Sequence, residues 1–289
     1  MTENLANPKN TIEIIKKHEF TFQKRFGQNF LIDGHVPEKI VAAAGVGKED
    51  TVLEIGPGIG TLTQYLARDA GHVVAVEIDR MLIPILEETL KDFTNVTVIS
   101  GDIMKCDLKA LCDKYNGGRP MKVVANLPYY ITTPVVMALL ESRAPIRSIT
   151  VMVQKEVADR MQAGPGTKDY GALSLAVRYH SRAKIVADVP PNCFMPRPKV
   201  GSAVIHLDCE GMDLLPEEEE KKLFALIKAA FGQRRKTLPN AVAGSGALPY
   251  DRETVAAALE RLGLKPTVRG EALELAQFEE LARELDRRN

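Results

Sequence analysis

The chain has 289 residues, of which 45% are hydrophobic and 26% are charged, and its 38 basic side chains balance its 38 acidic ones. This ordinary globular composition excludes wholesale disorder, and the zero net charge excludes a polycation that holds nucleic acid through bulk charge. The length fits one large domain or two, and it allows a sizeable core without disulfide or metal staples.

Short apolar runs alternate with longer amphipathic segments from residue 51 onward. The apolar runs predict strands at Thr51–Ile55, His72–Ile78, Val96–Ser100, Met121–Ala125 and Ser148–Val153. The segments between them predict helices at Gly60–Ala70, Arg80–Phe93 and Thr133–Ser142. Continuously apolar strands are typical of a parallel sheet that is buried on both faces. The order therefore predicts an α/β fold, with a Rossmann-like sheet and helices on both faces.

The pattern changes after Tyr170. Further strands are predicted at Leu173–Tyr179, Ala183–Val186 and Ser202–Leu207, with an irregular proline-rich loop at Pro190–Pro198. From Gly211 onward only helical periodicity remains, at Lys221–Phe231, Asp251–Leu262 and Leu273–Asp286. We therefore expect two domains, residues 1–210 with the sheet and residues 211–289 as a small all-α domain.

The sequence predicts neither a membrane protein nor a secreted one. No stretch approaches the roughly 20 apolar residues of a membrane helix, and the first ten residues lack the apolar core of a secretory signal. Four cysteines without a C-x-x-C pair are too sparse for a disulfide scaffold. His206 and Cys209 have a loosely metal-like spacing but lack a second ligand pair, so no metal site is predicted. We expect a reduced, cytoplasmic protein.

A glycine-rich turn, Glu-Ile-Gly-Pro-Gly-Ile-Gly at residues 54–60, follows the first predicted strand. Its glycines let the backbone turn sharply and let a ligand approach closely. A dinucleotide fingerprint would need a glycine at Thr61, and no Gly-Lys-Ser/Thr phosphate loop is present. Gly-x-Gly-x-Gly here is instead the form found in S-adenosylmethionine-dependent methyltransferases. By itself, the motif is also compatible with a tight turn that binds no ligand.

Two acidic residues stand at the ends of the next two predicted strands. Glu77 can accept both hydroxyls of a ribose, and Asp102 can hold an adenine amino group. Either residue alone is more simply interpreted as a solvated charge at a strand end. Because ligands bind outside the carboxyl ends of parallel strands, the two acids together with Gly56 favour a cofactor site.

The fourth predicted strand ends in Asn126-Leu127-Pro128-Tyr129. Tetrapeptides of this kind resemble those of methyltransferases that act on a planar nitrogen, whose lone pair is delocalised and poorly nucleophilic. The Asn126 side-chain oxygen and the Pro128 carbonyl can accept the two N–H hydrogens of such a nitrogen and favour a pyramidal geometry. Tyr129 can stack on the base. The alternative is a turn that ends a strand, with Asn and Pro as turn formers.

Two further segments carry a family resemblance: Phe-Gly-Gln-Asn-Phe-Leu at residues 26–31 and Phe-Met-Pro-Arg-Pro-Lys-Val at residues 194–200. With residues 126–129 they resemble the ribosomal RNA adenine dimethyltransferases over about residues 21–281. The resemblance implies a class I methyltransferase fold, S-adenosyl-L-methionine as cofactor, and closure of residues 26–31 over it. The implied cofactor contacts are Asn29, Leu31, Gly56, Glu77, Asp102 and Asn126. The implied catalytic group is Asn126, Pro128, Tyr129 and Phe194, with Tyr129 and Phe194 sandwiching the base.

Three features resemble the housekeeping branch of this family, which dimethylates two adjacent adenosines near the 3′ end of 16S rRNA in the small ribosomal subunit. Gly27 stands where the macrolide-resistance branch usually has serine, and Leu127 stands where it usually has isoleucine. Residues 231–238, Phe-Gly-Gln-Arg-Arg-Lys-Thr-Leu, resemble the housekeeping C-terminal domain. We expect a monomer with 16S rRNA as its partner, without an obligate protein partner or a membrane.

RNA binding by a neutral chain must rest on local basic patches. Between residues 143 and 184 eight basic residues stand against three acidic ones, and Arg197 and Lys199 flank the predicted base pocket. A second basic cluster comprises Lys228, Arg234, Arg235 and Lys236. Phosphate contacts of this kind give salt-dependent, sequence-tolerant affinity. Each residue taken singly is also compatible with a solvated surface.

Three other functions stay open on the sequence. They are a large-subunit dimethyltransferase of the macrolide-resistance type, a methyltransferase of a DNA adenine or a protein glutamine, and a non-catalytic ribosome assembly factor with this fold. The DNA and protein enzymes usually carry Asp/Asn-Pro-Pro-Tyr and lack segments like residues 26–31 and 194–200. The intact set of predicted site residues argues against lost catalysis.

Overall fold

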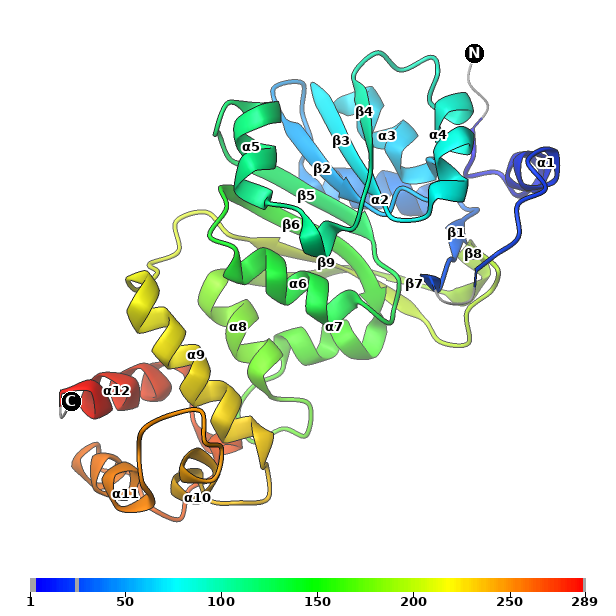
Figure 1. Cartoon of the computed structure of the whole chain (residues 1–289). Coiled ribbons are helices and arrows are strands. Elements are labelled where there is room, and N and C mark those ends of the chain that lie inside the picture. The colour runs from blue at the N-terminus through cyan, green and yellow to red at the C-terminus, as the bar shows by residue number, and fades with distance from the viewer. Residues whose placement is uncertain (1–3, 24–25, 288–289) are drawn as a thin grey trace. The chain divides into compact units, whose positions relative to one another are not determined.

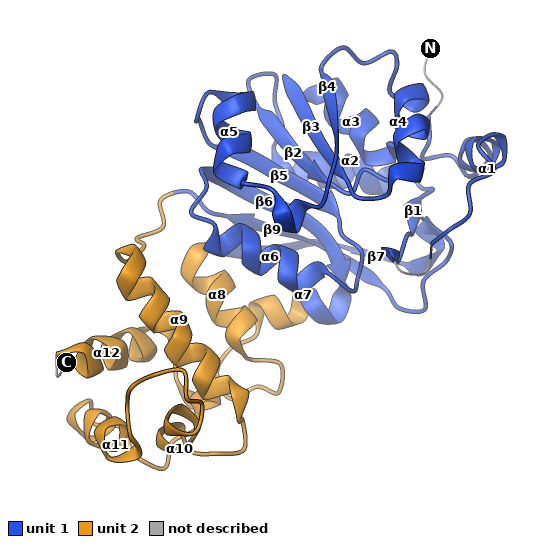
Figure 2. Ribbon diagram, in the orientation of Figure 1, with its two compact units in different colours: residues 1–158, 182–210 blue, residues 159–181, 211–289 orange. Residues whose placement is uncertain are grey.

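The computed structural model describes residues 4–23 and 26–287, and the chain forms two compact units (Figure 2). Unit 1 comprises residues 1–158 and 182–210, and unit 2 comprises residues 159–181 and 211–289. The division expected from the sequence, 1–210 and 211–289, places residues 159–181 with the sheet. In the structure this segment packs with the C-terminal helices instead.

Unit 1 is built on a seven-stranded sheet with the order β4-β3-β2-β5-β6-β9-β7 (Figure 1). Its strands are β2 (Thr51–Ile55), β3 (His72–Glu77), β4 (Val96–Ser100), β5 (Met121–Asn126), β6 (Ile146–Gln154), β7 (Arg182–Val189) and β9 (Ser202–Asp208). The strands from β4 to β6 pair in parallel, whereas β9 pairs antiparallel with β6 and β7. Every residue of β2 is buried, as expected of a strand covered on both faces.

Helices cover both faces of this sheet, which confirms the predicted α/β class. The described helices that lie wholly in unit 1 are α1 (Pro8–Lys17), α2 (His35–Ala44), α3 (Thr61–Asp69), α4 (Ile83–Thr89), α5 (Leu108–Asn116) and α6 (Thr132–Glu141), with the 3₁₀ turns η2 (Arg80–Leu82), η3 (Ile103–Lys105) and η4 (Pro191–Cys193). Of these, α1 lies beyond the edge of the sheet (Figure 1). In Figure 1, α2 and α3 lie behind the sheet and α5 and α6 lie in front of it. The helix predicted at Arg80–Phe93 is divided into η2 and α4. Pro84 lies in the first turn of α4, where a missing N–H is tolerated.

The order of the strands creates a binding crevice at the centre of the sheet. The chain proceeds from β2 to β3 and β4 on one side, and β5 and β6 lie on the other side of β2. In open parallel sheets, ligands bind outside the carboxyl ends of the strands where the direction of winding reverses. The reversal here lies between β2 and β5, so the glycine-rich turn and residues 126–129 follow neighbouring strands.

A second, two-stranded sheet joins the N-terminal segment to the proline-rich loop. β1 (Phe30–Leu31) pairs antiparallel with β8 (Phe194–Met195), which places Leu31 opposite Phe194. The Ile32 N–H donates to the Cys193 carbonyl at 2.9 Å and extends this pairing. The expectation of a wholly irregular loop at residues 190–198 is therefore wrong. The pairing strand lies far away in the sequence, so the local pattern does not reveal it.

The described elements of unit 2 are helical. They are α8 (Ala172–His180), α9 (Glu217–Gly232), α10 (Leu238–Ala243), α11 (Arg252–Arg261), η5 (Gly270–Ala272) and α12 (Leu275–Asp286), while α7 (Lys155–Gln162) crosses the boundary between the units. No helix in the described part of the chain combines the length and apolar character that membrane crossing requires.

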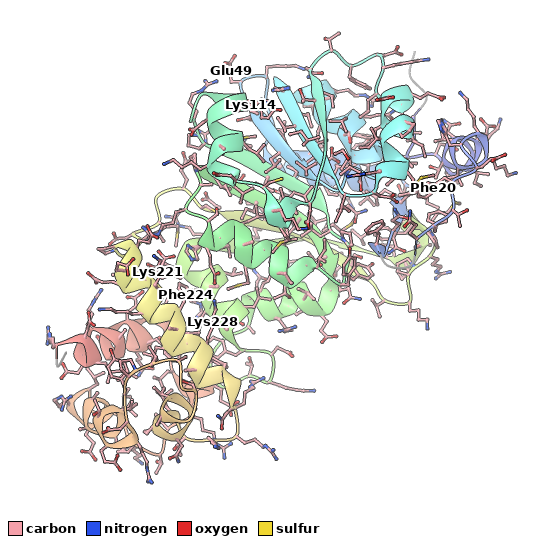
Figure 3. All side chains as sticks on the ribbon, in the orientation of Figure 1. Phe20, Glu49, Lys114, Lys221, Phe224 and Lys228 are labelled. Carbon is pink, nitrogen blue, oxygen red and sulfur yellow. The ribbon has the colours of Figure 1, made fainter. Side chains whose placement is uncertain are left out.

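The strand predicted at residues 173–179 is wrong, because this segment forms α8. A run of buried apolar residues does not by itself distinguish a strand from a buried helix. The Gly171 N–H donates to Ser174 Oγ at 3.2 Å and caps the start of the helix. At its end, the rings of Tyr179 and His180 pack on Phe224 of α9, with centroids 5.2 Å and 5.5 Å away (Phe224 is labelled in Figure 3). This packing attaches residues 159–181 to unit 2.

Candidate active site

A pocket opens in unit 1 at the carboxyl ends of β2, β3, β4 and β5. It holds about 960 Å³ of empty space, the open solvent at its mouth included. All nine residues predicted for the site line it: Asn29, Leu31, Gly56, Glu77, Asp102, Asn126, Pro128, Tyr129 and Phe194. The fold thus brings widely separated segments of the sequence to one place.

The glycine-rich turn lines this pocket with residues 54–58. Gly58 has φ +61° and Gly60 has φ +93°, left-handed conformations that a β-carbon disfavours. A β-carbon at Gly58 would lie 3.1 Å from the ring of Phe30, and one at Gly60 would lie 3.1 Å from Thr89 Oγ1. Glycine at these positions therefore allows both the turn and its close contact with β1 and α4.

Glu77 is buried at the end of β3, and its carboxylate is oriented by two backbone N–H groups. Oε1 accepts from Asp79 N–H at 2.7 Å, and Oε2 accepts from Gly58 N–H at 3.2 Å. Burial raises the pKa of Glu77 to about 7, an effect that these hydrogen bonds oppose. Since a carboxylate oxygen accepts more than one hydrogen bond, both oxygens retain capacity for ligand hydroxyls.

Glu54 and Thr61 also line the pocket, although the sequence did not predict them as site residues. Glu54 is fully buried in β2, and its Oε2, like Thr61 Oγ1, has no hydrogen-bond partner among the described residues. Burial raises the pKa of Glu54 to about 8, which the nearby Thr63 hydroxyl offsets only in part. Unpartnered buried polar atoms facing a pocket point to a polar ligand. The available signal was the position of Glu54 two residues before the first glycine.

Asp102 follows β4 and caps η3. Its Oδ1 accepts from the Met104 N–H at 3.0 Å, and its Oδ2 lies 4.0 Å from Lys105 Nζ. The N-cap hydrogen bond holds the side chain in a defined orientation at the pocket wall, while Oδ2 retains acceptor capacity. The residue can therefore accept a hydrogen bond from an amine.

Asn126 is the last residue of β5, and its amide is anchored from one side. Its Nδ2 donates to the Asn29 carbonyl at 3.1 Å. The Asn29 side chain itself donates to the Gly27 carbonyl at 3.0 Å. With the amide NH₂ held by the N-terminal segment, Asn126 Oδ1 is the atom that can accept a hydrogen bond from a substrate N–H.

The Pro128 carbonyl already accepts hydrogen bonds from within the chain. It accepts from the Ile131 N–H and from the Thr132 hydroxyl, both at 3.2 Å. A carbonyl oxygen has two lone pairs, so Pro128 can accept a substrate N–H only by sharing one of them. Leu127 lines the same pocket, and its carbonyl is the alternative main-chain acceptor.

Two of the residues predicted for the site, Tyr129 and Phe194, are aromatic. The Tyr129 hydroxyl lies 2.8 Å from Ser202 Oγ, a hydrogen bond that fixes the ring, and burial raises the Tyr129 pKa above its usual value. Phe194 is 3% exposed and is positioned by the pairing of β8 with β1. Both aromatic residues line the pocket, and such rings provide stacking surfaces for a nucleobase.

The basic residues predicted to contact RNA are divided between the two units. Of those between residues 143 and 184, Arg143, Arg147, Lys155, Arg182 and Lys184 belong to unit 1, whereas Arg160, Lys168 and Arg178 belong to unit 2. In the second cluster, Arg234 donates to the Lys168 and Tyr170 carbonyls at 2.9 Å and 3.0 Å. Arg235 and Lys236 are exposed. Arg234 therefore has a structural role within unit 2.

Comparison with known proteins agrees with this geometry. Residues 19–283 match the family described as Ribosomal RNA adenine dimethylase. The chain is 59% identical over 283 residues, 98% of either chain, to a protein of Lachnoclostridium phytofermentans named Ribosomal RNA small subunit methyltransferase A. A protein of the same name from Alkaliphilus oremlandii is 50% identical over the same share of both chains.

Two solved structures share the fold over 89% of this chain. A dimethyladenosine transferase from Plasmodium falciparum is 26% identical, with a TM-score of 0.72 and 98% of its own chain covered. The 23S rRNA methyltransferase ErmE is 27% identical, with a TM-score of 0.65 and 99% of its chain covered. The name of the first neighbour specifies no RNA and that of the second specifies 23S rRNA, so the likeness in structure alone does not select between small- and large-subunit RNA.

Proposed function

The chain belongs to the ribosomal RNA adenine dimethylase family, and we propose that it transfers methyl groups from S-adenosyl-L-methionine to the exocyclic amines of two adjacent adenosines near the 3′ end of 16S rRNA in the small ribosomal subunit. The observation that carries the proposal is the Asn126 amide, anchored on Asn29 so that Oδ1 can accept from an amine. We also propose a cytoplasmic location, because the proposed substrate is the ribosomal subunit.

Residues that line the pocket suit the groups of the cofactor. Glu77 would accept hydrogen bonds from the ribose hydroxyls, and Asp102 would accept one from the adenine amine. The unpartnered Glu54 Oε2 and Thr61 Oγ1 provide polar contacts for the charged amino-acid group of the cofactor. Residues 26–31, which include Asn29 and Leu31, line the same pocket. When bound, S-adenosyl-L-methionine supplies an electrophilic methyl group on a sulfonium.

The residues around Asn126 would activate a weak nucleophile by orienting it. An adenine that flips out of its stack, at an unstacking cost of about a few kcal/mol, enters between Tyr129 and Phe194. Asn126 Oδ1 accepts one amine N–H and a main-chain carbonyl of residues 127–128 accepts the other, so the nitrogen lone pair points toward the methyl carbon. In-line transfer requires an approach of about 3–3.5 Å. No general base is needed at the start, since methylation acidifies the amine and solvent takes the proton.

RNA would be held by exposed basic side chains on both units. Arg197 and Lys199 follow Phe194 directly in the chain and would contact phosphates next to the flipped base. Arg235 and Lys236, which are exposed, would bring unit 2 into contact with the ribosomal RNA. Such contacts supply most of the affinity and none of the sequence preference, so the shape of the RNA selects the target. We propose that the protein acts as a monomer.

Methyl transfer to ribosomal subunits tests the proposal directly. Labelled S-adenosyl-L-methionine is incubated in separate reactions with small and with large ribosomal subunits that lack the modification, and the labelled nucleotides are mapped by primer extension. We expect label on two adjacent adenosines near the 3′ end of 16S rRNA. Label on 23S rRNA would establish the large-subunit alternative, and cofactor binding without transfer to any RNA would favour the assembly factor.

The affinity for S-adenosyl-L-methionine is expected to fall as the pH drops from about 8 to about 6. Burial raises the pKa of Glu54 to about 8 and that of Glu77 to about 7. The cofactor's ammonium and hydroxyl groups favour the ionised carboxylates, so binding must expel protons that these groups hold at low pH. The affinity falls by up to about tenfold per pH unit for each protonated carboxyl.

Calorimetry in buffers with different ionisation enthalpies measures both the affinity and the protons released. Glu54→Gln, which cannot ionise, should remove the part of the pH dependence that lies above about pH 7. An affinity that does not change with pH would contradict the proposed contacts of both carboxylates.

Arg235→Ala is expected to weaken RNA binding without loss of stability, whereas Arg234→Ala should destabilise unit 2. Arg234 lies 3.3 Å from Glu271 Oε2 in addition to its two carbonyl contacts, and its loss should lower the free energy of unfolding by about 1–3 kcal/mol. Loss of a phosphate contact at Arg235 should reduce the salt slope, the steepness with which the logarithm of the RNA-binding constant falls with the logarithm of the salt concentration, by about one. Thermal unfolding and salt-dependent filter binding check the pair, and a salt slope unchanged in Arg235→Ala would exclude this contact.

A further inference from the structure

Asp79 is a buried charged residue outside the predicted site, and it connects the cofactor pocket to the N-terminal segment. Asp79 is only 2% exposed. Oδ2 accepts from Gln28 Nε2 at 2.7 Å, and Gln23 Nε2 donates to both carboxylate oxygens at 3.2 Å and 3.3 Å. Oδ1 also accepts from the Met81 N–H at 3.0 Å. A buried carboxylate with this many donors holds its partners firmly.

Gln28 is itself held on both sides of its amide. While its Nε2 donates to Asp79, its Oε1 accepts from the Gln23 N–H at 3.0 Å. Beyond Gln28, the ring of Phe30 packs on Phe20 and Phe22, with centroids 5.9 Å and 5.2 Å away (Phe20 is labelled in Figure 3). The segment between these two anchors is therefore fixed, and Asn29 lies within it.

The Asn29 carbonyl is the group that accepts from Asn126 Nδ2, so its place decides which way the Asn126 amide faces. A planar amide that loses this acceptor is free to turn by half a revolution and present Nδ2, a donor, to a substrate amine. An amine that meets a donor instead of an acceptor is not oriented for attack. The position of residue 29 thus bears on catalysis although its carbonyl makes no contact with the reacting atoms.

We propose that Gln28 is a positioning residue for methyl transfer, which acts through its hydrogen bond to Asp79 to place the Asn29 carbonyl and so to aim Asn126 Oδ1 at the substrate amine. The inference rests on the proposed function. The same Asp79 donates its N–H to Glu77 Oε1 at 2.7 Å. The residue that holds the N-terminal segment is therefore joined to the carboxylate proposed to bind the ribose, and cofactor binding and the orientation of Asn126 are linked.

Gln28→Ala is expected to slow single-turnover methyl transfer at saturating cofactor and RNA by about 10- to 100-fold, the loss that a small misplacement of a reacting group produces. Cofactor and RNA affinities should change by less than about tenfold. Thr21→Ala, an exposed change just before the segment, is the control and should leave the rate unchanged. A Gln28→Ala rate equal to that of the unaltered chain, or one fully restored by more cofactor, would overturn the proposal.

A polarity exchange separates positioning from a general structural role. Gln28→Glu faces Asp79 with a second carboxylate, and Asp79→Asn faces Gln28 with a second amide, so each single change should slow transfer. The double variant restores one donor and one acceptor, so its transfer rate should be at least about tenfold higher than that of either single variant. Equal rates in the double and single variants would contradict the proposal. Inactivity of the unaltered chain on every RNA would instead refute the proposed function, which keeps the two failures distinct.

Discussion

Asn126→Ala should lower the rate of methyl transfer at saturating cofactor and RNA by about 100- to 1,000-fold, the usual effect of removing one preorganised hydrogen-bonding group from an active site. The side chain ends β5, and its Nδ2 is held by Asn29, so that Oδ1 is aimed without reorganisation when substrate arrives. Single-turnover transfer of a labelled methyl group to unmodified small subunits measures the change.

RNA binding by Asn126→Ala should stay within about threefold of the unaltered chain, and cofactor binding within about tenfold, because each has many other contacts. Asn10→Ala, on α1, removes a similar amide that donates to the Asn4 carbonyl and serves as the matched control. Full activity of Asn126→Ala would refute the hydrogen-bond role, and a loss confined to RNA affinity would make Asn126 a binding residue only.

Glu77→Gln should weaken S-adenosyl-L-methionine binding by about 100-fold. Hydrogen bonds to a charged acceptor contribute about 1.5–3 kcal/mol each, and a carboxylate accepts from both ribose hydroxyls where an amide accepts from one. In the unaltered chain, the Gly58 and Asp79 N–H groups both donate to the Glu77 carboxylate. In the variant, one of these two N–H groups would face the amide NH₂ of glutamine instead of an acceptor. Calorimetric titration with the cofactor measures the change.

The effect of Glu77→Gln should be overcome by cofactor concentration, since the residue does not touch the substrate amine. The maximal transfer rate is expected to fall by less than about threefold. Glu87→Gln, at an exposed position of α4, is the matched control. A dissociation constant unchanged in Glu77→Gln would show that the ribose lies elsewhere. A loss of transfer rate that saturating cofactor does not restore would show that Glu77 acts in the transfer step.

The sheet was predictable because its strands have a plain physical signature. β2 and β3 are buried on both faces, so their sequences are continuous apolar runs bounded by turn residues, and the predicted bounds agree to within a residue. The same signature failed at α8, whose apolar side chains are buried on nearly every side in unit 2. Burial all round removes the periodicity that distinguishes a helix from a strand.

The residues of the site were predictable where one local motif carries the chemistry, as at Gly56 and Asn126. Contacts that depend on long-range pairing were not. The pairing of Phe194 with Leu31, and the hydrogen bonds of Asp79 to the N-terminal segment, join positions whose local sequences show no sign of each other. The engagement of the Pro128 carbonyl by Thr132 likewise depends on the geometry of the turn into α6.

A crystal structure with a cofactor analogue and an adenosine-containing RNA hairpin tests the central claim most directly. The account predicts Asn126 Oδ1 within hydrogen-bond distance of the adenine N6, Nδ2 still on the Asn29 carbonyl, and the base between Tyr129 and Phe194. A complex in which the Asn126 amide presents its nitrogen to the base, or in which the adenine amine lies away from β5, would contradict it.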